Sequence, residues 1–209
     1  MVDNHNALQI NIDTSGIDRA KEHLQHIKGG AQTAVKAAIN KAAIGIKTDA
    51  GRETSKAFAV DSDTVKKRMW VTKATDSSMS AEVGRRGPRF FARNFPRTDN
   101  PSPGRRGTAA VFLRPRRDGG GWFLNEERGL SKAFVATLPG RGRGVYRRII
   151  GKVNSDGGRS SLIHARGLSV PEMLSDAFVR QTIEANATKR LNEELDRQVD
   201  RLLSKGATL

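Results

Sequence analysis

The chain has 209 residues, no cysteine, few aromatic side chains (eight Phe, two Trp and one Tyr) and a formal net charge of +15. The length fits one domain, or one domain with a long insertion, and the lack of cysteine excludes disulfides, iron–sulfur clusters and cysteine-ligated zinc. Because no apolar run is long enough to cross a bilayer and the polar stretch Met1–Asn6 is no signal peptide, we expect a protein made in the cytoplasm, without membrane contact.

The first part of the chain is predicted to hold one strand and two helices. Alternating apolar residues predict a strand over residues 8–13, and helical spacing predicts a short helix over residues 17–27 that ends at Gly29-Gly30. A longer helix is predicted over residues 31–58. Its apolar stripe consists of Val35, Ile39, Ala42, Ile46 and Ala50. Because these side chains are mostly small, the stripe predicts close packing against another helix or a sheet. Gly45 and Gly51 mark either close packing or a bend.

A short helix and a hairpin are predicted next. Asp61 and its polar neighbours supply N-cap chemistry for a helix that runs to Arg68. Residues 70–75 and 79–83 then form a pair of predicted strands around the turn at residues 76–78.

Positive charge is concentrated in residues 85–166. This segment holds 17 Arg and two Lys against five acidic residues, a net charge of +14, so the other 127 residues are close to neutral. A surface that serves only solubility has no reason to prefer Arg over Lys, whereas the planar guanidinium group suits phosphate and carboxylate partners. The segment is therefore predicted to face a polyanion or an acidic protein.

Within this segment, three phenylalanines alternate with arginines in Arg89-Phe-Phe-Ala-Arg-Asn-Phe95. These rings could stack on bases, but docking of the segment on a core or a neighbouring subunit is favoured. Residues 96–107 are predicted to form an exposed loop, residues 109–114 a strand, residues 119–121 a turn, and residues 122–124 an extended stretch.

The clearest predicted hairpin pairs residues 132–138 with residues 145–150 across the turn 139–144. Its tip carries Arg141 and Arg143, its return strand carries Arg147 and Arg148, and residues 151–161 follow as a second loop. Twelve arginines of the segment are the candidate contacts with nucleic acid or a partner: Arg85, Arg86, Arg89, Arg93, Arg105, Arg106, Arg116, Arg117, Arg141, Arg143, Arg147 and Arg148.

The chain is predicted to end in a long helix over residues 168–203. Ser169 and Glu172 have capping-box spacing, and Pro171 lies in the first turn, where its missing N–H costs nothing. The predicted apolar face consists of Leu174, Phe178, Ala187, Leu191, Leu195, Val199 and Leu202. The predicted outer face carries Glu184, Glu193, Glu194, Asp196 and Asp200.

Together these elements predict an α+β fold. A small antiparallel β-sheet with hairpins is expected to pack against a long helix in the N-terminal half and a long C-terminal helix. Residues 1–84 supply the first strand and helices of the single domain, residues 85–166 the Arg-rich hairpin and loop segment, and residues 167–209 the final helix, which packs on the same domain.

Patterns that would indicate an enzyme are incomplete. His23 and His26 could share a metal ion, but no third ligand is indicated. The glycine-rich turn at 140–144 lacks the P-loop pattern, and Ser160-Ser161 with His164 lacks a nucleophile elbow. A nuclease would need converging carboxylates, and the five acidic residues of the basic segment are scattered. We therefore expect no catalytic residue, no metal and no cofactor.

Three stretches of the chain resemble the minor tail protein Z family of tailed bacteriophages, which belongs to the tail-completion and neck proteins. The first comprises Ala38-Ile-Asn-Lys-Ala-Ala43, Arg52-Glu-Thr54 and Val65-Lys-Lys-Arg68, and is similar to the family's N-terminal region. The second comprises Ala133-Phe-Val and Val145-Tyr-Arg-Arg-Ile149, and is similar to its central hairpin. The third is Gly167-Leu-Ser-Val-Pro-Glu-Met-Leu174, which resembles the entry to its last helix, with Leu168 where proline is usual.

The resemblance implies a structural virion protein rather than an enzyme. It implies action late in tail assembly, near the head-proximal end where the DNA terminus enters the tail, in the virion tail or neck after assembly in the host cytoplasm. It also implies a homo-oligomeric ring, with a hexamer favoured. The implied partners are neighbouring tail and neck proteins (terminator, connector and tail tube) and phage DNA.

One alternative belongs to another class of protein. A free, sequence-nonspecific nucleic-acid-binding protein would also carry a basic segment of this kind. It would bind nucleic acid tightly as an isolated chain, with a steep dependence on salt concentration.

Overall fold

The computed structural model describes residues 20, 22–25, 29–98, 110–153 and 160–206, and it confirms the α+β class. The chain divides into two compact units. The helical unit comprises residues 1–55, 61–87 and 170–209, and the sheet unit comprises residues 56–60 and 88–169. The predicted strand at residues 8–13 and most of the predicted loop at residues 96–107 lie outside the described residues.

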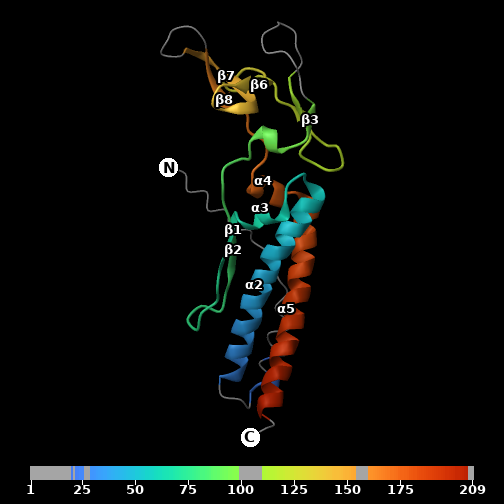
Figure 1. Cartoon of the computed structure of the whole chain (residues 1–209). Coiled ribbons are helices and arrows are strands. Elements are labelled where there is room, and N and C mark those ends of the chain that lie inside the picture. The colour runs from blue at the N-terminus through green and yellow to red at the C-terminus, as the bar shows by residue number, and fades with distance from the viewer. Residues whose placement is uncertain (1–19, 21, 26–28, 99–109, 154–159, 207–209) are drawn as a thin grey trace. The chain divides into compact units, whose positions relative to one another are not determined.

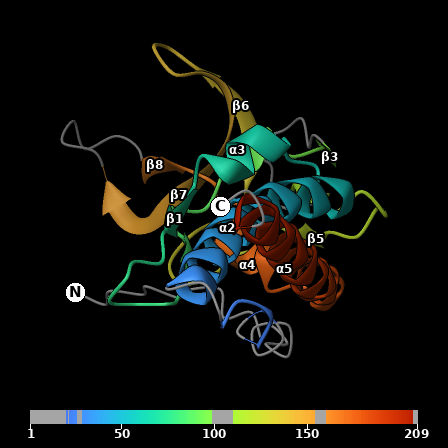
Figure 2. The ribbon, with the colours of Figure 1, turned by 90° about the horizontal axis from the view of Figure 1, so that it is seen from below.

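Two long helices form the body of the helical unit. Helix α2 (Gly30–Ala57) and helix α5 (Ala177–Gly206) lie side by side (Figures 1 and 2). Buried residues of both helices form one core together with Ala20 and Leu24: Ala20, Leu24, Ala34, Val35, Ala38, Ala42, Leu191, Leu195 and Val199. The prediction of α2 is confirmed, and its small side chains pack against a second helix.

The two glycines of α2 are places of close packing. A Cβ atom on Gly45 would lie 2.8 Å from Cδ of Arg190, and a Cβ atom on Gly51 would lie 2.7 Å from Cγ of Lys66. Each glycine therefore makes room for a side chain from another element of the unit.

The C-terminal helix differs from its prediction. A short helix α4 (Val170–Leu174) ends before Ser175, and α5 begins at Ala177 with the Asp176 carboxylate accepting a hydrogen bond from the Val179 amide at 3.3 Å. This N-cap starts a new helix, so the apolar face continues through Val179 and Ile183, both fully buried. Phe178 was predicted to belong to that face, but its side chain is exposed.

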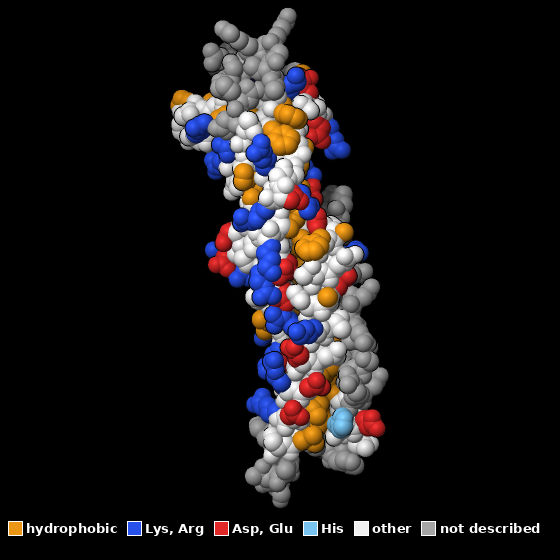
Figure 3. Space-filling model, turned by 90° about the vertical axis from the view of Figure 1, so that its right-hand side faces the viewer, with side chains coloured by type: hydrophobic (Ala, Val, Ile, Leu, Met, Phe, Trp, Pro, Cys, Tyr) orange, Lys and Arg blue, Asp and Glu red, His pale blue; other side chains and the backbone are white. Residues whose placement is uncertain are grey.

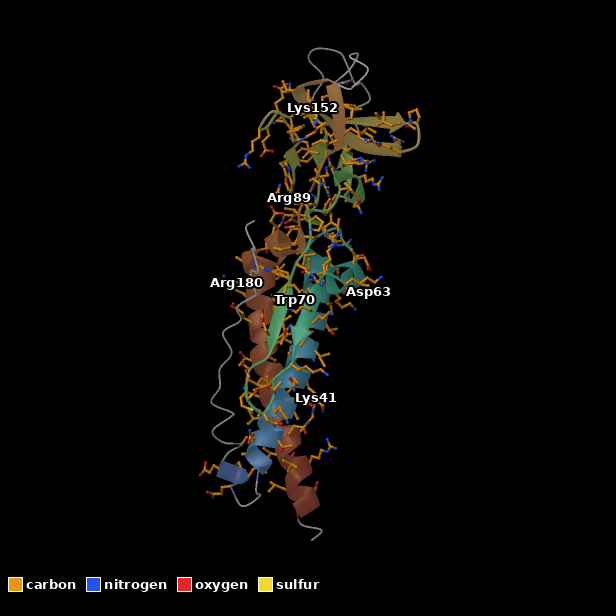
Figure 4. The ribbon with its side chains drawn as sticks, turned by 90° about the vertical axis from the view of Figure 1, so that its left-hand side faces the viewer. Lys41, Asp63, Trp70, Arg89, Lys152 and Arg180 are labelled. Atoms are coloured by element: carbon orange, nitrogen blue, oxygen red, sulfur yellow. The ribbon has the colours of Figure 1, made fainter. Side chains whose placement is uncertain are left out.

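A short helix and a hairpin complete the helical unit. Both were predicted, but the strands are shorter than expected and residues 73–81, rather than a turn at 76–78, connect them. Helix α3 (Ser62–Lys66) is capped by Asp61, whose carboxylate accepts a hydrogen bond from the Thr64 amide at 3.0 Å. Strands β1 (Met69–Thr72) and β2 (Glu82–Arg85) pair antiparallel. The amide side chain of Asn40 bonds both the N–H and the C=O of Ala74 (2.7 and 3.2 Å), which holds the hairpin along α2 (Figure 4).

The sheet unit contains two three-stranded antiparallel sheets. Strands β3 (Arg97–Thr98), β4 (Phe112–Leu113) and β5 (Trp122–Phe123) form the first, and a 3-10 turn at Ala92–Asn94 precedes it. Strands β6 (Phe134–Leu138), β7 (Gly142–Val153) and β8 (Ser160–His164) form the second.

The second sheet corrects the prediction of a loop over residues 151–161. Strand β7 continues to Val153, and β8 begins at Ser160 and pairs with it. The predicted hairpin of β6 and β7 is confirmed, although its turn is shorter than expected. Leu138 pairs with Gly142, so Arg143 lies on the strand opposite Thr137 rather than at the tip.

Candidate nucleic-acid and partner interface

The hairpin of β6 and β7 fixes the position of Arg141. Its backbone N–H donates to the Leu138 carbonyl at 3.1 Å, and Gly140 and Gly142 on either side have positive φ angles of 70° and 67°. The buried Tyr146 hydroxyl donates to the Gly142 carbonyl at 3.3 Å. The turn is therefore held by backbone and ring contacts, which leave the exposed Arg141 side chain free to meet an external group.

Arg147 and Arg148 follow on the return strand and point to opposite faces, as consecutive strand residues do. Arg147 is buried, with a guanidinium nitrogen 3.8 Å from a carboxylate oxygen of Glu127. Burial lowers the pKa of Arg147, and the charge of Glu127 opposes this shift. Arg148 is half-buried, with its guanidinium carbon 5.3 Å from the centre of the Phe134 ring.

The phenylalanines near Arg89 have different roles. Phe90 and Phe95 are buried and meet edge to face at 6.1 Å, which agrees with the favoured docking interpretation. Phe91 is half-buried between two guanidinium groups, with Arg166 at 4.4 Å and Arg93 at 5.2 Å from its ring centre. These contacts hold two exposed arginines at fixed positions on the surface.

Pairing of arginine with an aromatic ring recurs along the chain. Arg86 lies over Trp70, Arg114 over Phe112 and Arg116 over Phe58, at 5.3–5.7 Å. Arg116 also donates to Asp118 at 3.0 Å. A planar guanidinium stacks on a ring in a way that an ammonium cannot, so part of the preference for Arg over Lys comes from contacts within the protein.

The predicted contact residues fall into three groups among the described residues. Those with exposed side chains are Arg86, Arg89, Arg93, Arg117, Arg141 and Arg143, and those half-buried are Arg116 and Arg148. Arg85 and Arg147 are buried. Arg105 and Arg106 lie outside the described residues. The structure brings most of these side chains onto the sheet unit, whereas Arg85 and Arg86 belong to β2 and the residue after it in the helical unit.

Arg85 has a contact inside its own unit. One guanidinium nitrogen donates to the Ser175 hydroxyl at 3.4 Å, which connects β2 to the junction of α4 and α5. Burial lowers the pKa of Arg85. Its position is typical of a structural arginine.

Three arginines of the sheet unit were not among the predicted contacts although their side chains are exposed: Arg114, Arg128 and Arg166. The immediate sequence neighbours of each are uncharged or acidic, whereas most of the predicted residues lie in adjacent pairs or in the hairpin of β6 and β7. The overall charge of the segment included them, but no local pattern distinguished them.

His164 lies on β8 among these arginines. Its ring is 4.7 Å from the Tyr146 ring and 4.9 Å from the Phe91 ring, centre to centre. Burial lowers the pKa of His164, and the charges of Arg93, Arg141 and Arg166 lower it further. The imidazole is therefore neutral at pH 7, and the positive charge of this surface comes from guanidinium groups.

The described part of the chain shows neither a metal-binding cluster nor a membrane-spanning helix. No group of three or more His, Cys, Asp or Glu side chains there could hold a metal ion. Among the described helices, none combines the length and the apolar character needed to cross a membrane.

The fold and this surface define an α+β protein whose distinguishing feature is a set of arginines fixed on short antiparallel sheets. The family model of the prophage minor tail protein Z matches residues 14–205, and the chain belongs to this family. The resemblance found in the sequence is thereby confirmed, and the protein is a phage minor tail protein, a component of the virion. No curated protein and no solved structure matches the chain.

Proposed function

We propose that this tail protein completes the head-proximal end of the tail and joins the tail to the head. It forms a homo-oligomeric ring, with a hexamer favoured to match sixfold tail symmetry. Its Arg-rich sheet unit contacts DNA or the adjoining ring proteins. The neighbouring proteins in this position are the terminator, the connector and the tail tube.

The observation that supports this proposal is the separation of charge between the two units. The sheet unit holds 18 Lys and Arg against five Asp and Glu, a net charge of +13, so +2 remains for the helical unit. In Figure 3, basic and acidic side chains alternate along the face of the helical unit. Figure 4 places Arg89 and Lys152 at opposite ends of the sheet unit.

This arrangement suits contact with DNA of any sequence. Phosphate groups carry no base information, so arginines that meet them hold DNA without selecting a site. Arginines already held against aromatic rings lose less side-chain freedom when they bind. The helical unit supplies the packed body of the protomer and its contacts within the ring.

Charge reversal at the hairpin tip and on the adjoining strand tests the proposal. Arg141→Glu together with Arg143→Glu should leave the protomer folded, because the turn is held by its backbone and by Tyr146. The same change should block the formation of infectious particles when the variant replaces the natural protein in a phage. The measurement is the infectious titre together with the thermal unfolding of the purified chain.

The matched control is Lys73→Glu with Arg201→Glu, two exposed cations of the helical unit, which makes the same change in net charge. We expect a titre close to that of the natural phage. A normal titre for the hairpin variant would exclude this hairpin as the contact. Tight DNA binding by the isolated chain, with no role in tails, would instead favour a free nucleic-acid-binding protein.

A further inference from the structure

The sheet unit contains a pocket that the proposed DNA contact does not explain. Its volume is about 420 Å³, within the range of pockets that hold a ligand or a side chain of a partner. Trp122, Phe123, Leu130 and Ile163 provide its apolar wall. Three of these side chains are exposed, and Phe123 is 51% accessible. Exposed aromatic side chains around a hollow are typical of a surface that a partner covers.

The charged side chains of the pocket are mixed. Arg89, Arg128, Arg147 and Arg166 line it together with Glu126 and Glu127, a net charge of +2 with neutral His164. The two carboxylates would repel a DNA phosphate. A phosphate bound in the pocket would also leave its apolar side chains exposed to water. An occupant with one apolar side chain would cover the apolar wall, and a small excess of negative charge would complement the net positive charge of the pocket.

Arg128, one of the lining residues, lies in a tight hairpin turn. Arg128 has a φ angle of 47°, the only positive value at a non-glycine among the described residues. It lies in the turn between Glu127 and Leu130, which bond to each other through their backbones at 2.8 and 3.1 Å. Gly129 follows with a φ angle of 76°, so the two residues form a two-residue hairpin turn of the kind that requires positive φ at both central positions, and this turn carries Arg128 in the lining of the pocket.

The same chain carries a surface with the complementary properties. Phe178, in the first turn of α5, is 69% exposed, the largest value among the exposed large hydrophobic side chains. Glu172, Asp176 and Glu184, all half-buried, surround it in the sequence, and the exposed Arg180 pairs with Glu184 at 3.6 Å; the net charge of residues 170–184 is −2. This short acidic region with a protruding ring belongs to the helical unit, whereas the pocket belongs to the sheet unit.

We propose that the occupant of the pocket is a second copy of this chain, whose Phe178 enters between Trp122, Phe123 and Ile163. The acidic residues around Phe178 then meet Arg128 and Arg166 at the rim. The contact joins two different surfaces of identical chains, which is the head-to-tail geometry that closes a ring. The inference rests on the ring of the proposed function and specifies the contact that builds it.

Disulfide trapping tests the contact directly, because the natural chain has no cysteine. One full-length chain carries Phe123→Cys and a second, distinguishable by mass, carries Phe178→Cys. The two are mixed under mild oxidation, and the product is measured on denaturing gels. We expect the mixed disulfide to form readily, and to form several-fold less when Arg128→Glu is added to the first chain.

The matched control replaces Phe123→Cys by Ile150→Cys, since Ile150 is also exposed on the sheet unit (58%) but does not line the pocket. Equal trapping at both positions would overturn the proposed contact. The contact would also be overturned if a chain that carries both Phe123→Cys and Phe178→Cys formed only an intramolecular disulfide and stayed at monomeric mass.

The mass of the natural chain in solution, measured over a range of concentrations, separates this inference from the proposed ring. If the natural chain forms oligomers but no mixed disulfide forms between positions 123 and 178, only the proposed contact with Phe178 is overturned. A chain that remains monomeric at every concentration and in purified tails overturns the ring as well.

Discussion

At the scale of single residues, two buried carboxylates set how α2 and α5 align. Asp49 on α2 is 1% exposed and accepts hydrogen bonds from Arg190 at 2.9 Å and from Arg52 at 2.7 Å. Glu194 on α5 is also buried and pairs with Lys41 and Arg197. The rest of the seam is mostly Ala, Leu and Val, which would tolerate a sliding of one helix against the other. Two ion pairs across the seam specify one alignment.

The sequence did not reveal this role of Glu194. Glu193 and Glu194 together were predicted to lie on a solvated outer face, and Glu194 instead faces α2. Two adjacent helical residues differ by about 100° in direction, so one of a pair can face a partner helix while the other faces water. The position of Lys41 on α2 determines that Glu194, and not Glu193, faces the partner helix. The sequence around the two glutamates contains no information about that position.

Acidification should weaken the helical unit through Glu194. Burial alone would raise its pKa, but the hydrogen bond and charge of Lys41, and then the charge of Arg197, outweigh burial and hold the pKa below the ordinary 4.5. A carboxylate with a lowered pKa contributes stability that is complete above its unfolded pKa and is lost as the pH falls through the folded value. We expect the unfolding midpoint in urea to fall as the pH is lowered below about 4.5.

Glu194→Gln tests this assignment, because the amide keeps the shape without the titrating group. The variant should be less stable than the natural chain at pH 7 and should lose less stability on acidification. An exposed carboxylate of the same helix, Asp200→Asn, is the control and should leave the pH dependence unchanged. Identical pH profiles for Glu194→Gln and the natural chain would show that another group is responsible.

At the scale of elements, the hairpin of β1 and β2 depends on one cross-strand pair. Trp70 and Gly84 lie directly opposite each other, and a Cβ atom on Gly84 would fall 2.0 Å from the indole ring. The ring therefore lies across the glycine, and it also supports Arg86 at 5.4 Å. A glycine inside a strand is normally unfavourable, and here the indole covers the surface that it exposes.

Gly84→Ala should displace the Trp70 ring. We expect a loss of about 1–3 kcal/mol in the free energy of unfolding, as for other overpacked sites. The measurement is urea unfolding followed by circular dichroism. In a Trp70→Leu background the same change should cost much less, because the clash is gone. Equal costs in the two backgrounds would mean that the ring does not lie over Gly84.

Elements with strong periodicity or a distinct capping or turn residue could be predicted from the sequence, whereas the break between α4 and α5 and strand β8 could not. Helix α2, the Asp61 cap and both hairpins follow from spacing and turn residues. The break between α4 and α5 depends on Asp176 as an N-cap, and an apolar pattern on both sides concealed it. Strand β8 is short and follows polar residues, so its sequence carries no recognisable strand pattern that would predict its pairing with β7.

At the scale of the whole molecule, the sequence placed the positive charge correctly in one segment but could not say which arginines are accessible. On β7, Arg143 is exposed, Arg147 is buried and Arg148 is half-buried, although Arg143 and Arg147 lie on the same face of the strand. Several other arginines are held at the surface by contacts of their guanidinium groups with aromatic rings. The division of charge between units thus follows from composition, whereas the accessibility of each arginine depends on which other side chains cover it, and this requires the tertiary structure.

This division of charge predicts how DNA binding should depend on assembly and salt. An isolated chain offers DNA only a few arginines, so its binding should be weak, while a ring presents the same set repeatedly and should bind more tightly. Removing phosphate contacts lowers the slope of log K against log salt by about 0.9 per contact. Arg141→Glu with Arg143→Glu should therefore reduce the slope for purified tails by about 2, whereas Lys73→Glu with Arg201→Glu should leave it unchanged. A slope that is the same for the natural and hairpin variants would mean that this hairpin meets a protein neighbour rather than the genome.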